Sequence, residues 1–190
     1  MNNRLSATLW LFAIGLVLQA SSLQAAEIKG VTFAERHLVD QTELRITGMG
    51  VLTWALLFDV YVGAFYLPKG MSGERWAEDV PKRLELSYLR SISAEDFSRA
   101  SDKLLRKQLP PGQYQALAER LQEFYRLFRD IRPGDRYSLT YSPTGGTELR
   151  FNNQLLGAAS GADFAVAYFG IWLGPEPIDK GFRDRLLTGG

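Results

Sequence analysis

One stretch of the chain, Gly48–Pro68 (GMGVLTWALLFDVYVGAFYLP), constrains the fold more than any other. It is long, apolar and rich in β-branched and aromatic residues, which predicts a central β-strand that stops at the proline. The glycine pair at its start indicates a turn or bulge. Alternation in the second half predicts one face that is apolar except for Tyr66, and another face with Asp59, Tyr61 and a gap at Gly63. Such a strand suits the floor of a ligand cleft; the alternative is an ordinary core strand.

The first 26 residues have the order of an export signal. Arg4 supplies a positive charge, an apolar segment (TLWLFAIGLVL) follows, and small residues (SSLQAA) end at Ala26. The apolar segment is too short to span a bilayer, and no later segment is long enough. We expect cleavage after Ala25 or Ala26 and a periplasmic mature domain, residues 27–190, with no stable membrane span. An uncleaved anchor is the alternative.

Composition excludes several classes of function. The chain has no cysteine and a single histidine, His37, which we expect at the surface. This inventory argues against the common zinc and copper sites, Cys–His pairs and the Ser–His–Asp triad, and no nucleotide-binding loop is present. We therefore expect no metal and no cofactor. Removal of the signal takes one of 22 basic residues and none of 21 acidic ones, so the mature chain is formally neutral, which argues against nucleic acid and an anionic membrane surface.

Hydrophobic periodicity predicts a sheet followed by helices, then more sheet and more helices. We expect strands at 28–33, 42–47, 84–90, 136–141, 147–151 and 154–158, and helices from Ser93, over 113–129, over 164–173 and from Asp179. Helix 164–173 is apolar nearly all round and must therefore be buried. The pattern predicts a single α+β domain, with an antiparallel sheet and helices packed on one face.

Polar side chains at strand positions are the candidate ligand-binding residues. They are Asp59, Tyr61, Tyr66, Tyr88 and Arg90. Arg90 ends an alternating row of apolar side chains, where its guanidinium could pair with the carboxylate of a ligand whose tail lies along the row. The alternative for Arg90 is a surface arginine at the end of a strand.

Four segments together resemble bacterial chalcone isomerase-like proteins of the periplasmic branch. They are FDVYVGAFYLP, LELSYLRSISAEDF, RPGDRYSLTYSPTGGTELRFNNQLLG and DFAVAYFGIWLGPEPID, and the resemblance covers nearly all of the chain after the signal. It implies an open-faced β-sandwich with a cleft between the sheet and the helices.

The plant enzymes of this family close a chalcone to a flavanone with an arginine, threonine and tyrosine groups, whereas other members bind fatty acids. By spacing, the arginine falls at Leu52, the threonine at Tyr61, the tyrosine at Phe97 and the last hydroxyl near Ser160. The resemblance therefore adds Phe97 and Ser160 to the candidate ligand-binding residues. A buried anionic intermediate without its cation is costly, so we assign no catalytic residue. We expect a non-catalytic protein that binds a fatty acid or similar apolar carboxylate. An isomerase acting on a chalcone-like enone is the alternative, and a structural module with a filled cleft is a third reading.

Overall fold

The computed structural model describes residues 25–54 and 57–189, so all but the last two residues of the predicted signal lie outside the described part. The strands are β1 (Ala25–Ile28), β2 (Val31–Ala34), β3 (Arg36–Val39), β4 (Thr42–Trp54), β5 (Phe58–Pro68), β6 (Lys82–Tyr88), β7 (Arg136–Ser142), β8 (Gly146–Phe151) and β9 (Gln154–Ala159). The helices are the 3₁₀ turn η1 (Gly73–Arg75), α1 (Ala94–Gln108), α2 (Pro111–Tyr125), α3 (Ala162–Leu173) and α4 (Lys180–Thr188).

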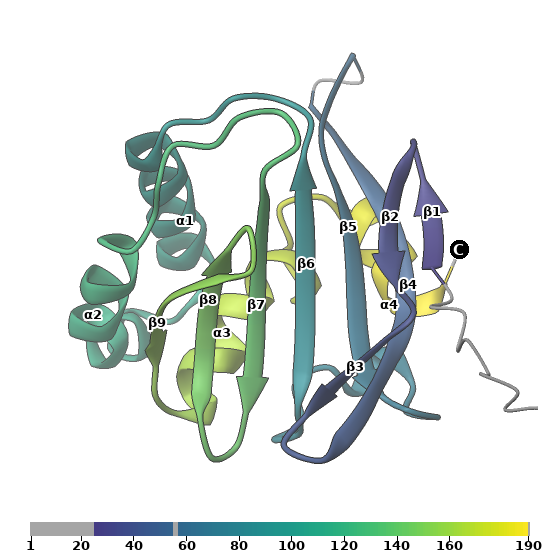
Figure 1. The fold of residues 1–190 in the computed structure, drawn as a ribbon. Coiled ribbons are helices and arrows are strands. Elements are labelled where there is room, and N and C mark those ends of the chain that lie inside the picture. Colours follow the sequence, from purple (N-terminus) through teal and green to yellow (C-terminus); the bar gives the residue numbers. More distant parts are fainter. Residues whose placement is uncertain (1–24, 55–56, 190) are drawn as a thin grey trace, which may run out of the picture.

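Seven strands, β3 to β9, form one antiparallel sheet in which every strand pairs with its neighbour in sequence. The short connections account for this order, because tight turns join adjacent antiparallel strands. Asn152 and Asn153 make one such turn with positive φ angles of 47° and 68°, as asparagine tolerates. β4 and β5 are the longest strands, and their hairpin extends above the rest of the sheet in Figure 1.

The helices lie on one face of this sheet, which confirms the predicted α+β architecture (Figure 1). Side-chain caps fix where two of them begin: Ser93 accepts a hydrogen bond from the backbone of Asp96, and Asp179 accepts one from Phe182. α3 is buried over most of its surface, as its apolar sequence predicts. The main core therefore lies between the sheet and the four α-helices.

The opposite face of the sheet is covered in part by the β1–β2 hairpin (Figure 1). A second, smaller hydrophobic cluster forms there, made of Phe33, Leu44, Val62, Ala64 and Tyr66. Within the described residues no helix has the length and apolar character needed to cross a bilayer.

The glycines of β4 and β5 serve helix packing as well as the predicted bulge, and the predicted gap at Gly63 is occupied by a side chain of α4. A Cβ on Gly48 would lie 2.1 Å from the carbonyl oxygen of Arg185, so only glycine lets α4 approach the strand. The gap at Gly63 is filled by Phe182 of α4, whose ring would meet an added Cβ at 2.6 Å. A bulge does occur beside Gly48, where the β4–β5 register shifts.

Candidate ligand-binding cleft

A cleft of about 140 Å³ opens between one end of the sheet and the helices. Most of its walls are apolar, and they come from β4, β5, α1, α3 and the segment before α4. The lining residues are Leu52, Trp54, Val60, Tyr61, Ile92, Asp96, Phe97, Ala100, Ser101, Leu104, Ile171, Trp172 and Ile178. No lysine or arginine is among those lining residues. The volume is below the roughly 300–1,000 Å³ of pockets for drug-sized ligands, so it holds only part of a long chain without rearrangement.

A β-bulge sets which side chains of the β4–β5 hairpin face the cleft. Leu52 pairs with Tyr61, but the next pair is Thr53 with Asp59, so Val60 is an extra residue on β5. The extra residue shifts the alternation by one, and Val60 and Tyr61 both line the cleft. Asp59 consequently turns away from the helices.

The polar groups of the cleft are mainly neutral hydroxyls. The indole Nε1 of Trp172 donates to the hydroxyl of Tyr61 at 2.9 Å, which leaves the Tyr61 proton available for a second acceptor. Ser101 also lines the cleft, with its Oγ 3.5 Å from the Tyr168 hydroxyl. Burial raises the pKa of Tyr61 and of Tyr168 well above 10, so both phenols are neutral donors at physiological pH.

Tyr88 lies against the same ring cluster but does not itself line the cleft. Its ring is 5.4 Å from that of Tyr61 and 6.2 Å from that of Phe97. Its hydroxyl is buried and has no hydrogen-bond partner in the described part of the chain. A second apolar space, of about 10 Å³, shares Phe97 and Trp172 with the cleft. Phe97 therefore stands between the two spaces.

Arg90 lies outside the predicted strand row, because β6 ends at Tyr88. Its side chain is exposed, and its guanidinium carbon sits 4.6 Å from the ring centre of Phe58. Phe58 pairs across the hairpin with Trp54, which lines the cleft. The structure thus places Arg90 next to the rim of the cleft rather than at the end of a buried row.

Three other predicted site residues lie apart from the cleft, which corrects their placement together. Tyr66 is five positions from Tyr61 and faces the opposite side of the sheet, with its ring 4.7 Å from that of His37. Asp59 pairs with Lys29 at 3.2 Å and accepts a hydrogen bond from Thr53. Ser160 is exposed in the β9–α3 connection.

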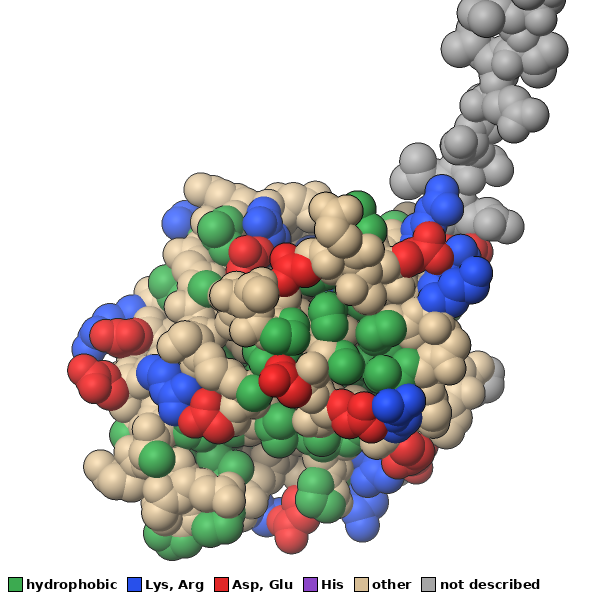
Figure 2. All heavy atoms as spheres, turned by 90° about the horizontal axis from the view of Figure 1, so that it is seen from below, with side chains coloured by type: hydrophobic (Ala, Val, Ile, Leu, Met, Phe, Trp, Pro, Cys, Tyr) green, Lys and Arg blue, Asp and Glu red, His purple; other side chains and the backbone are tan. Residues whose placement is uncertain are grey.

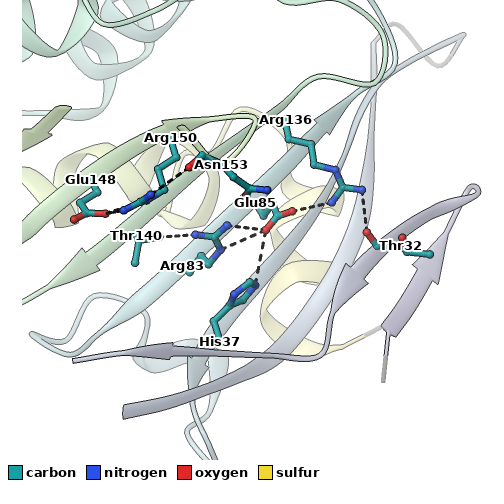
Figure 3. A network of polar contacts seen from close by, with 9 residues as sticks. All are labelled: Thr32, His37, Arg83, Glu85, Arg136, Thr140, Glu148, Arg150 and Asn153. Carbon is teal, nitrogen blue, oxygen red and sulfur yellow. Dashed lines mark hydrogen bonds and ion pairs between the residues drawn. The ribbon is translucent and has the colours of Figure 1, made fainter. Parts of the chain in front are cut away.

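Figure 3 shows a charged network on the face of the sheet opposite the helices. Glu85 is buried and accepts from Arg83 at 2.9 Å and from Arg136 at 2.8 Å. Burial acts to raise the pKa of Glu85, but the two guanidinium groups outweigh it and hold that pKa below its usual value. Arg136 also donates to the backbone oxygen of Thr32 in β2 at 2.9 Å. The network therefore fastens the β1–β2 hairpin to the sheet, and two guanidinium groups share the single carboxylate of Glu85.

His37 belongs to this network, so it is half-buried rather than a surface residue. Its Nε2 lies 3.8 Å from the carboxylate of Glu85. Burial and the nearby Arg83 lower the pKa of His37 despite the opposing effect of Glu85. Within the described residues, no three His, Asp or Glu side chains are grouped so that they could hold a metal ion.

A larger groove, of about 650 Å³, lies between η1, the α1–α2 junction and α3. These segments lie toward the lower end of the molecule in Figure 1, and Figure 2 shows hydrophobic side chains gathered on that end with charged side chains around them. The two carboxylates of the groove are already paired: Asp163 with Arg120 at 2.6 Å, and Glu176 with Lys107 at 3.3 Å. The cleft differs because its Tyr61 hydroxyl keeps a free proton.

The arrangement of sheet and helices agrees with comparisons to known proteins. The family described as chalcone isomerase-like matches residues 25–188. The chain belongs to this family. A crystal structure of an Arabidopsis thaliana fatty-acid binding protein has the same fold as this chalcone isomerase-like protein, with a TM-score of 0.68 and 15% identity over 86% of this chain and 96% of that one. No curated protein sequence matches the chain.

Three of the four positions carried over from the chalcone isomerase-like family by spacing meet in the cleft, and Ser160 does not. Leu52, Tyr61 and Phe97 all line it. The side chains that sequence reasoning did not assign come from α3 and α1, chiefly Trp172 and Ser101. The sequence did contain a pattern that could have identified Trp172. A helix that is apolar all round packs against both the sheet and the neighbouring helices, so its large side chains lie where a cleft between those layers would form.

Proposed function

We propose that this protein is a non-catalytic binding protein that holds a fatty acid or similar apolar carboxylate in the cleft between the sheet and the helices. The proposal rests chiefly on an apolar cleft whose mouth lies beside an exposed guanidinium, that of Arg90. The shared fold with a fatty-acid binding protein is consistent with it.

The ligand's tail and its carboxylate would occupy different parts of the site. The tail would pack between the β4–β5 hairpin and α3. The carboxylate would stay at the rim, because the cleft lining supplies no cation and a buried unpaired charge is costly. A hydrogen bond from Thr53 and, to a lesser extent, the charge of Arg90 lower the pKa of the nearby Asp59 carboxyl. Arg90 makes no close ion pair among the described residues, and its guanidinium could pair with a ligand carboxylate there.

Titration of a fluorescent fatty acid tests the proposal. Ala100→Phe, which fills the cleft, should weaken binding more than tenfold, because the tail loses most of its buried apolar area. Ala116→Phe makes the same change in the separate groove and should leave the affinity unchanged. If Ala116→Phe weakened binding and Ala100→Phe did not, the ligand site would be the groove and not the cleft. Absence of saturable binding in the wild type would favour a structural module with a filled cleft.

Arg90→Ala should weaken binding by about twofold to fivefold. This loss of affinity is smaller than the loss expected for a buried arginine, because an exposed ion pair contributes only about 0.2–1 kcal/mol. Arg36→Ala, a change of an exposed arginine on β3, is the control and should have no effect. Equal affinities for both variants would remove Arg90 from the site.

We also propose that the protein is exported to the periplasm and cleaved after Ala25 or Ala26. Cleavage there would shorten β1 by one or two residues and leave the seven-stranded sheet complete. N-terminal sequencing of the protein from its native host is the test, and an intact Met1 would contradict the proposal.

A further inference from the structure

The β4–β5 hairpin exposes large hydrophobic side chains on both sides of its turn. Trp54 is 67% exposed, Leu57 75% and Phe58 46%. Only three other large hydrophobic side chains are exposed in residues 25–54 and 57–189, and they are Leu38, Leu155 and Val166. Exposed apolar groups concentrated at one projecting end indicate a contact surface.

We infer that this hairpin end docks on a lipid bilayer, with Trp54, Leu57 and Phe58 entering the interfacial region. The inference rests on the exposed side chains. Only the further step, that the ligand enters the cleft from the bilayer, rests on the proposed function.

The composition of the hairpin end fits a bilayer interface. Tryptophan and phenylalanine beside arginine are typical of that region, because the rings enter the acyl boundary while the guanidinium stays at the phosphates. Arg90 lies on the ring of Phe58, in position to do this. The carboxylate nearest the hairpin end, that of Asp59, is neutralised by Lys29 at 3.2 Å. Asp96 at the cleft mouth is likewise paired with Arg99 at 3.2 Å.

The size of the surface argues against a second protein as the occupant. Three side chains bury a few hundred Å² at most, since a large aromatic buries about 150–250 Å². A specific protein interface needs about 1,000 Å² or more. A bilayer needs no such area, because shallow insertion of a few apolar groups already gives reversible binding.

The position of Trp54 connects the docking surface with the cleft. Its side chain lines the cleft and is also largely exposed. A bilayer in contact with the hairpin end would therefore adjoin the cleft mouth, and an apolar ligand could pass between them without crossing water.

Co-flotation with phosphatidylcholine vesicles tests the docking directly. We expect the wild type to float and Leu57→Ser to lower the partition coefficient about tenfold, since the leucine no longer enters the acyl boundary. Leu38→Ser is the matched control, because Leu38 is 71% exposed and lies on β3, away from this hairpin end. Equal flotation of the two variants would overturn the inference. So would release by 0.5 M salt, which would show that charge and not apolar insertion holds the protein.

Vesicles with brominated acyl chains identify the inserted residue. They should quench tryptophan fluorescence in the wild type, and the quenching should disappear in Trp54→Phe while flotation persists. The other tryptophans do not account for it: Trp172 is 3% exposed, Trp76 lines the separate groove beside η1, and Trp10 lies in the predicted signal. Quenching that survives in Trp54→Phe would overturn the inference. A wild type that does not float but dimerises in light scattering, with Leu57→Ser monomeric, would instead assign the surface to a second copy of the chain.

Fatty-acid titration without vesicles separates this inference from the proposed function. Leu57→Ser should bind the fluorescent fatty acid as the wild type does, because Leu57 does not line the cleft. A protein that floats but binds no fatty acid would refute the proposed function and leave the docking in place.

Discussion

Replacement of Tyr61 by phenylalanine removes one oxygen from the core and should destabilise the protein by about 1–3 kcal/mol. The Tyr61 hydroxyl accepts the Trp172 indole N–H at 2.9 Å, and both side chains are at least 96% buried. Without that oxygen the N–H is buried with no acceptor, and its desolvation is no longer compensated. For a chain of this length, each kcal/mol corresponds to about 2–4 °C in Tm.

Tyr88→Phe is the matched control for this prediction. It makes the same change on the neighbouring strand, but the buried Tyr88 hydroxyl has no partner in the described part of the chain. Its removal deletes a desolvated polar group and no hydrogen bond, so Tm should stay the same or rise. Urea denaturation and thermal melts of both variants provide the measurement. Equal destabilisation, or a Tyr61→Phe variant as stable as the wild type, would refute the assigned hydrogen bond.

Three further predictions address packing, pH and catalysis. Gly48→Ala should lower the free energy of unfolding by at least the roughly 1–3 kcal/mol of an overfilled core, because the added methyl meets the backbone of α4. Gly112→Ala, which has open space around it, should not lower the stability in the same melts. The lowered pKa of His37 means that the unfolded chain takes up its proton first as the pH falls below about 6.5. Stability should therefore decrease between pH 7.5 and 5.5, and His37→Gln should flatten this slope in melts across that range, since the chain has no other histidine. Finally, a hydroxylated chalcone should cyclise no faster with the protein than without it in a spectrophotometric assay, because Leu52 stands where the arginine is expected; saturable turnover would contradict this.

Local patterns in the sequence were sufficient to predict the fold class. Alternation in β6 and β7 and the apolar period of α1 depend only on neighbours in the chain, and the capping interaction at Ser93 was visible three residues away. The short strand β3 was missed, because its sequence (RHLV) begins with polar residues. The strand lies at the edge of the sheet, where little apolar surface has to be buried. The helix expected from residue 113 begins two residues earlier, at Pro111. Proline is favoured at the first position of a helix, so Pro111 belongs to α2 and does not only end the preceding helix.

The candidate site depended on interactions that no local pattern contains. Strand alternation separated Tyr61 from Tyr66 by face, but the bulge that turns Asp59 outward exists only in the pairing of β4 with β5. Likewise, the sequence contained the gap at Gly63, and only the packing of α4 placed Phe182 in it.

The sequence by itself determined most of the strands and helices and which of their faces are apolar, because those properties follow from residue type and spacing along the chain; it did not show β3 or the turn that divides the expected strand 28–33 into β1 and β2. Tertiary structure decided which apolar faces meet, which polar groups find partners and where a space remains. Arg90 illustrates the difference. The sequence placed it in a buried row, but β6 ends two residues earlier, and its guanidinium lies instead on a ring that the neighbouring hairpin brings from 32 positions upstream.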